Sequence, residues 1–246
     1  MANWNDTDQR QGFNAVPRAG DAVARGATFD AGLRKHMLSI YNYMASGVLL
    51  TGIVALLTAR SGLALTFASG PLMWIVALAP LAFVFAMSFG VNKFSKATLN
   101  ILFWAFATIM GLSLSTIFLV YTGESIAATF FATAGAFAGL SLFGYTTKKD
   151  LSGFGTFLVM GVIGLMIAMV INIFLQSSTL ALAVSFLGVL IFAGLTAYDT
   201  QRLKREYEYL RGTEFAGKAI IMGALSLYLD FINMFLFLLR FMGSRE

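Results

Sequence analysis

The stretch that decides the fold is ALSLYLDFINMFLFLLR, residues 224–240, which is almost entirely apolar yet carries Asp230 near its middle. A water-soluble helix places a carboxylate on a polar face, but this segment has little polar face to offer. An Asp at the centre of a membrane-spanning helix costs about 2.5–3.5 kcal/mol on the scale of insertion experiments. The segment therefore predicts a membrane helix whose carboxylate faces other helices or a wet cavity instead of lipid.

The composition of the whole chain agrees with this interpretation. Of the 246 residues, 58% are hydrophobic and only 12% are charged, whereas about 25% charged residues are typical of a soluble domain. Cysteine is absent, which excludes disulfides, thiolate metal sites and cysteine nucleophiles. Seven apolar stretches are long enough to cross a bilayer, and they cover residues 36–58, 71–89, 97–121, 125–145, 153–175, 178–199 and 217–239. We therefore predict an all-α integral membrane protein with seven transmembrane helices over residues 34–246.

Residues 1–33 differ in composition from the rest of the chain. They mix Gly, Asn, Arg and Asp and contain no apolar run, so they do not have the features of a signal peptide. We expect a mobile polar tail.

The basic residues predict the orientation. Fourteen Lys and Arg fall in the N-terminal tail and on the side of the second, fourth and sixth connections, against three on the other side. Because cytoplasmic loops carry the excess of positive charge, the N-terminus is expected in the cytoplasm and, after seven spans, the C-terminus outside. The positive charge is thus a topology signal, and we expect no nucleic-acid partner.

Polar side chains follow single faces of several predicted spans. In the last span Ser226, Asp230 and Asn233 lie at i, i+4 and i+7, and the first and third spans add Asn42 and Ser115. Such residues either line a pore or form hydrogen bonds between helices, which contribute about 0.6 kcal/mol each on average. We keep Asn42, Ser115, Ser226 and Asn233 as candidates for lining a pore.

Asp199, in the stretch AYDTQRLK at the end of the sixth span, is the natural partner for Asp230. Two carboxylates within reach in a low dielectric do not ionise together easily and share a proton, which makes a pH sensor. Fully ionised, the same pair offers the hard oxygen ligands that Ca²⁺ prefers. The alternatives are a neutral structural acid at Asp230 and a solvated helix cap at Asp199 beside Arg202.

The depth of the two carboxylates speaks against this pairing. Asp199 lies 21 residues after Ser178, or about 31 Å of helix, whereas Asp230 lies ten residues before Arg240, or about 15 Å. If the sixth span ends at Asp199, the two carboxylates are separated by about half the membrane.

Several stretches in order along the chain follow a known pattern, and they are YNYMASGVLLTG (41–52), MGLSLSTIF (110–118), FGYTTKKDLSGFG (143–155), AYDTQRLK (197–204) and ALSLYLDFINMFLFLLRFMG (224–243). They resemble the transmembrane Bax-inhibitor motif family, and its bacterial members most of all. The resemblance implies a seven-helix fold in the bacterial inner membrane, with the last helix at the centre of the other six. It also implies a pH-sensitive calcium leak whose sensor is a hydrogen-bonded pair of aspartates matching Asp199 and Asp230.

One position departs from the family pattern. Members of this kind carry an arginine near the start of the third span that can act as a latch on the aspartate pair. In this chain Lys93 stands there and Lys96 follows one turn later. Lysine keeps the charge but lacks the planar fork that binds a carboxylate with two hydrogen bonds. The two lysines are therefore either a modified latch or topology signals only.

No catalytic motif is visible, because the chain has neither a glycine-rich phosphate loop nor an HExxH or Ser/His/Asp arrangement. We expect no enzyme and no cofactor, with lipid, protons and Ca²⁺ as partners and Ca²⁺ as the transported ion. Two alternatives remain. The first is a regulatory protein that binds other membrane proteins or a membrane-anchored quality-control protease without ion flux of its own. The second, an intramembrane aspartic protease, lacks the paired motifs of such enzymes.

The charge bias makes a direct prediction about topology. A reporter fused after Glu246 should behave as an exported protein, because seven spans from a cytoplasmic N-terminus leave the C-terminus outside. Activity of paired reporters that work on opposite sides of the membrane measures this. A cytoplasmic signal would remove one span from the predicted seven.

Overall fold

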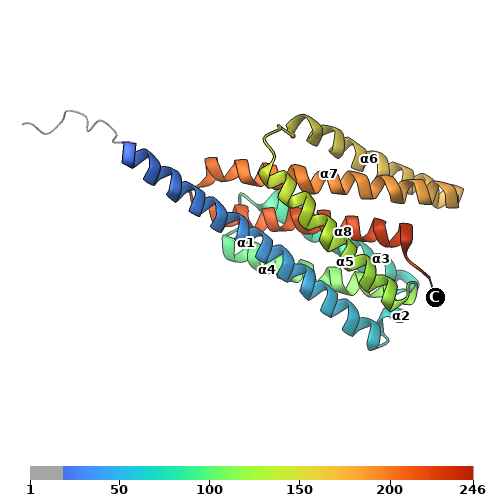
Figure 1. The fold of residues 1–246 in the computed structure, drawn as a ribbon. Coiled ribbons are helices and arrows are strands. Elements are labelled where there is room, and N and C mark those ends of the chain that lie inside the picture. The colour runs from blue at the N-terminus through green and yellow to red at the C-terminus, as the bar shows by residue number, and fades with distance from the viewer. Residues whose placement is uncertain (1–18, 246) are drawn as a thin grey trace, which may run out of the picture. The chain divides into compact units, whose positions relative to one another are not determined.

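The computed structural model describes residues 19–245, and the regular elements of this part of the chain are all helices (Figure 1). Seven of them are long and apolar enough to cross a membrane, which confirms the predicted number of spans. The elements are α1 (Ala19–Arg60), α2 (Leu63–Phe67), α3 (Gly70–Gly90), α4 (Lys96–Leu114), η1 (Ser115–Leu119), α5 (Gly123–Thr146), α6 (Ser152–Leu175), α7 (Ser178–Leu210) and α8 (Ala216–Met242).

The predicted tail falls mainly on residues 1–18, which lie outside the described residues. Its last part is helical, because α1 begins at Ala19. The stretch from Ala19 onwards contains Ala, Arg and Leu, which favour helix, between its glycines. That the tail is mobile stays a prediction. The chain divides into two compact units at Lys35, and the second unit, which begins at His36, contains the spans except for the start of the first, which begins at Asp30.

The sixth span is longer than predicted. Helix α7 does not end at residue 199 but continues to Leu210. The added stretch, TQRLKREYEYL, is charged but rich in residues that favour helix, so its backbone remains helical after its apolar face ends.

Helix α8 is the most buried of the seven. In its most apolar stretch 67% of the residues are buried, against 39% or less in the other spans. It packs against α4, α5 and α7, and Thr51 of α1 hydrogen-bonds to it. In Figure 1 it lies beside α7. These contacts place it inside the bundle, and a complete ring of six helices around it stays a prediction.

Tyr228 ties three helices together within the apolar interior. Its hydroxyl lies 2.7 Å from the hydroxyl of Thr51 on α1, and Thr51 in turn donates to the carbonyl of Ala107 on α4 at 2.7 Å. The ring of Tyr228 makes edge contacts with Phe103 and Phe106 of α4. A buried tyrosine hydroxyl requires such a partner, because an unpaired one costs about 1–3 kcal/mol.

Helices α5 and α7 approach each other closely at one glycine. A Cβ atom placed on Gly144 would overlap the carbonyl oxygen of Ala197. The obstacle is backbone, so no rotamer change of a flexible side chain would relieve it. Small residues at such crossings allow helix backbones to pack closely in membranes, and this one lies two residues before Asp199.

This contact predicts an asymmetry between two glycines of α5. Gly144→Ala should lower the midpoint of thermal unfolding in detergent by several degrees, because α5 and α7 must move apart. Gly139→Ala should change the midpoint of thermal unfolding by less than a degree or raise it, since a Cβ at Gly139 would meet nothing within 4 Å. Following the monodisperse fraction on heating measures both variants. Equal behaviour of the two would contradict the close packing.

Candidate functional site

The length of α7 brings the two membrane aspartates to the same level. Asp199 lies 11 residues before the end of α7 at Leu210, and Asp230 lies 14 residues after the start of α8 at Ala216. At the standard rise these distances are about 16 and about 21 Å from the short connection between the two helices. The expectation that the carboxylates are separated by half the membrane is therefore wrong, because it assumed that the sixth span ends at Asp199.

Asp199 is held by a small polar cluster between α7 and α8. The hydroxyl of Ser226 donates to Asp199 Oδ2. Arg202 Nη1 lies 3.3 Å from Asp199 Oδ1, and its Nη2 donates to Ser226 Oγ at 3.1 Å. One guanidinium thus contacts the carboxylate both directly and through the serine. Its Nε also lies 3.4 Å from the carboxylate of Glu206.

Asp230 follows Ser226 by four residues on α8. It is as buried as Asp199, with 5% of its surface exposed. Its Oδ2 atom is buried and has no hydrogen-bond partner among the described residues. Most buried polar atoms in proteins have a partner, and a buried acceptor without one costs about 1–3 kcal/mol. Asp230 Oδ2 is therefore a position where a proton, a water molecule or a cation would be stabilising.

Two hollows lie along α8, one before Asp230 and one after it. The first, of about 380 Å³, lies among α3, α7 and α8, and its polar lining is Ser88, Arg202, Glu206 and Ser226. The second, of about 360 Å³, is almost entirely apolar, and its α8 wall consists of Phe231, Ile232 and Phe235. The carboxylate pair lies between a hollow with charged walls and a hydrophobic one.

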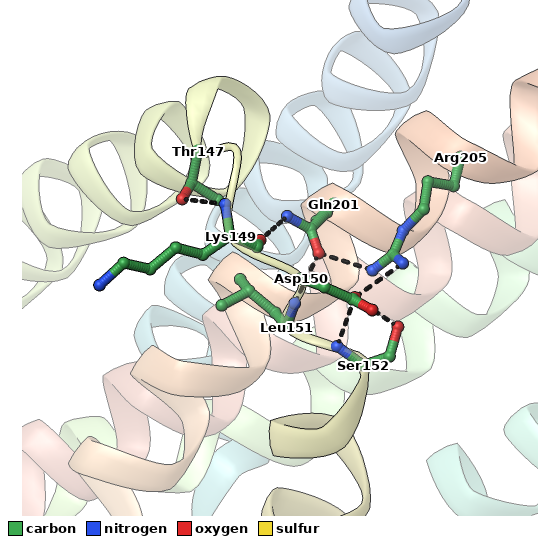
Figure 2. A network of polar contacts seen from close by, with 7 residues as sticks. All are labelled: Thr147, Lys149, Asp150, Leu151, Ser152, Gln201 and Arg205. Carbon is green, nitrogen blue, oxygen red and sulfur yellow. Dashed lines mark hydrogen bonds and ion pairs between the residues drawn. The ribbon is translucent and has the colours of Figure 1, made fainter.

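A second polar network fixes the connection between α5 and α6 to α7 (Figure 2). Gln201 donates to the carbonyl of Lys149 at 2.8 Å and accepts from the amide of Leu151 at 2.9 Å. Arg205 donates to Gln201 at 2.6 Å and to Asp150 at 2.8 Å. Figure 2 shows these side chains converging on the loop, two and six residues after Asp199 on the same helix.

Asp150 remains charged throughout the physiological range. The backbone amide of Ser152, followed by its hydroxyl and by Arg205, lowers the pKa of Asp150 to about 2. A lowered pKa means that the bonds of this carboxylate stabilise the fold at all higher pH values and are lost only as the pH falls from about 3.8 towards 2. This network therefore does not respond to pH between 5 and 8.

The two lysines considered as a latch do not lie at the aspartate pair. Lys93, in the connection between α3 and α4, and Lys96, the first residue of α4, are both exposed. The Lys96 side chain lies against Gly217, in the first turn of α8. Asp230 is 13 residues further on, about 20 Å along the helix. The cation beside the pair is Arg202 instead.

The four residues proposed to line a pore have different positions. Ser226 contacts Asp199 and Arg202. Ser115 is buried, but its hydroxyl donates to Leu112 in its own helical segment, and the Asn233 amide likewise donates to Leu229. Asn42 is exposed, because the buried face of α1 consists of Ile40, Met44, Val48 and Thr51 on the opposite side. Of the four, only Ser226 belongs to the aspartate cluster.

Arg202 belongs to the site, although from the sequence its charge was expected to act only as a topology signal. Asp199, Arg202 and Glu206 lie at i, i+3 and i+7, which places charges of opposite sign on one helix face. This spacing is visible in the sequence once the helix is allowed to continue past Asp199.

The pair supplies two carboxylates for a metal ion, and the described residues contain no cluster of three or more His, Cys, Asp or Glu side chains suited to one. Ca²⁺ takes six to eight oxygen ligands. Asp199 and Asp230 would provide only part of such a shell, which suits an ion in passage better than a permanently bound one.

Comparison with known proteins places the chain in a family. The family model described as "Inhibitor of apoptosis-promoting Bax1" matches residues 33–246. An uncharacterised protein of Caulobacter vibrioides is 50% identical over 88% of this chain and 91% of its own length. A Rickettsia prowazekii protein is 45% identical over 91% and 95%. The Escherichia coli inner membrane protein YbhL is 47% identical over 88% and 94%. The chain is therefore a seven-span membrane protein that belongs to the Bax inhibitor family.

Proposed function

We propose that the protein is a pH-sensitive leak pathway for Ca²⁺ across the bacterial inner membrane, gated by Asp199 and Asp230. The observation that carries the proposal is the buried carboxylate of Asp230, which has an oxygen atom without a partner among the described residues and lies one turn from the Asp199 cluster. Ionisable residues inside a membrane bundle characteristically mark ion or proton pathways.

The two carboxylates differ in a way that suits a proton-operated gate. Asp199 has a cation and a hydroxyl as partners, whereas the Oδ2 atom of Asp230 has none among the described residues. A proton shared by such a pair neutralises one of the two charges. Removal of the proton leaves two negative charges for one guanidinium, and a divalent cation restores the balance.

The two hollows support a route along α8. The hollow lined by Arg202, Glu206 and Ser226 offers polar walls up to the pair, while the one beyond Asp230 is apolar. Hydrophobic constrictions close ion pathways because water leaves them. The structure in this interpretation is a closed state, and the apolar hollow must take up water for an ion to pass.

Replacement of either aspartate tests the gate. In proteoliposomes of purified protein and pure lipid, Ca²⁺ flux should vary between pH 5 and pH 8. Asp199→Asn and Asp230→Asn should each flatten this response or shift it by more than a unit, because each removes the partner with which the other shares a proton. The double variant should add little, since the two residues act as one unit.

Asp150→Asn is the matched control, because it removes a carboxylate near α7 that keeps its charge from pH 5 to pH 8. Its pH response should follow that of the wild type. A normal response of Asp199→Asn together with a lost response of Asp230→Asn would show that Asp230 acts alone. Absence of flux at every pH in pure lipid would reject the leak and favour the regulatory protein that acts through membrane partners.

Arg202 should set the pH at which the response occurs. Arg202→Gln removes the cation 3.3 Å from Asp199, so the protonated pair should persist to higher pH and the midpoint should rise by about a unit. Lys204→Gln is the control, because Lys204 donates to the carbonyl of Tyr145 instead. The same flux assay measures both variants, and an unchanged midpoint in Arg202→Gln would remove the arginine from the gate.

A further inference from the structure

A polar hollow of about 460 Å³ lies at the end of the bundle where α6 meets α7. Two arginines reach it from the end of the chain, Arg240 in the last turn of α8 and Arg245 just after it. Its other polar walls are Asn172, Gln176 and the serines at positions 177, 178 and 185. No Asp or Glu is among the described residues that line it.

A second hollow, of about 320 Å³, adjoins the first on the side of the membrane spans. Asn172, Ala181 and Arg240 line both, so the two lie side by side. The walls specific to the second are the apolar side chains of Met169, Ile173 and Val184. It lies between spans α6 and α7, so it opens to where the hydrocarbon of the bilayer would be.

The two arginines are held differently, because Arg240 Nη1 lies 4.0 Å from Met169 Sδ in the wall of the second hollow, whereas Arg245 is held from outside the hollow. The chain after α8 is fastened to α5, since Ser244 N donates to Ser125 Oγ at 2.9 Å and Thr122 N to Ser244 O at 3.2 Å. The Arg245 guanidinium lies 5.9 Å from the centre of the Tyr121 ring. The ion pairs within residues 19–245 involve Arg202 and Arg205, and neither Arg240 nor Arg245 takes part in one.

We propose that this double hollow binds one anionic phospholipid. Arg240 and Arg245 bind its phosphate, and one acyl chain occupies the apolar hollow between α6 and α7. Guanidinium groups bind phosphate oxygens with paired, charge-assisted hydrogen bonds, and the apolar walls of the second hollow offer a chain van der Waals contacts. The occupant is a lipid and not a free anion, because the phosphate site adjoins an apolar one. The site is independent of the proposed gate.

Lipid binding to the detergent-purified full-length protein tests the proposal. Native mass spectrometry with phosphatidylglycerol, phosphatidylcholine and glycerol 3-phosphate should show retention of phosphatidylglycerol above the other two. The choline cation would be repelled by the arginines, and the bare headgroup has no chain for the apolar hollow. Arg240→Gln and Arg245→Gln should each weaken binding of phosphatidylglycerol about fivefold, and the double variant on the order of 20-fold.

Two further variants separate the parts of the site. Arg60→Gln removes the remaining arginine near that end of the spans but is not part of the hollow, so phosphatidylglycerol binding should stay within about twofold of the wild type. Ala181→Leu fills the junction of the two hollows and should weaken binding with both arginines present. Thermal unfolding without added lipid shows that each variant is folded.

Three results would overturn the proposal. If Arg60→Gln weakened phosphatidylglycerol binding as much as Arg240→Gln or Arg245→Gln, only the overall positive charge on this side of the protein would matter. Undiminished binding in Ala181→Leu would mean that no chain enters the apolar hollow. Competition by glycerol 3-phosphate as effective as that by the lipid would make this a site for soluble phosphates.

Discussion

Placing one carboxylate on α8 inside an apolar bundle is the constraint on which the arrangement of the other helices depends. A charge that faces lipid costs several kcal/mol, so the face of α8 that carries Asp230 must be covered. Helix α7 covers this face and adds a second acid, Asp199. Arg202, on the same helix, lies 3.3 Å from Asp199 and compensates its negative charge. Burial of one acidic residue thus accounts for the depth of α8 in the fold, for its packing against α7 and for the polar cluster between them.

The two aspartates of the cluster are unequal. Asp199 has a cation and a hydroxyl as partners, whereas the Oδ2 atom of Asp230 has no partner among the described residues. Ser226 connects Asp199 and Arg202 and lies one turn before Asp230 on the same face of α8. The neighbouring network of Gln201, Arg205 and Asp150 uses the same kinds of group, yet Asp150 is exposed to water and keeps its charge. Burial, and not the type of residue, distinguishes the aspartate cluster from this network.

The sequence was sufficient for the seven spans, because hydrophobic length is a local property. The cost of a buried charge drew attention to Asp230, which the structure buries as it does Asp199, and their role as a site stays a proposal. The sequence was not sufficient for the end of α7. Hydropathy indicates which residues lie in the membrane, but not where a helix ends, and the charged stretch TQRLKREYEYL remains helical after the apolar residues stop. The same error hid the place of Arg202 beside Asp199. Lys93 and Lys96 were considered for another reason, because the family resemblance implies a cation near the start of the third span. Asn42 was expected to line a pore but is exposed, since one polar residue does not reveal which face of α1 is buried.

The close contact of Gly144 with Ala197 has a mechanical consequence for any gate built on α7. Where two helices touch through their backbones, they cannot approach further, and the dense packing around them resists separation. Such a point behaves as a fulcrum. Asp199 lies two residues from it, so it moves little in a tilt of α7, while both ends of the helix, near Ser178 and near Leu210, move much further. In the proposed gate, a tilt of α7 would widen the hollow around Arg202 and Glu206, while the carboxylate pair, close to the contact between Gly144 and Ala197, would move little.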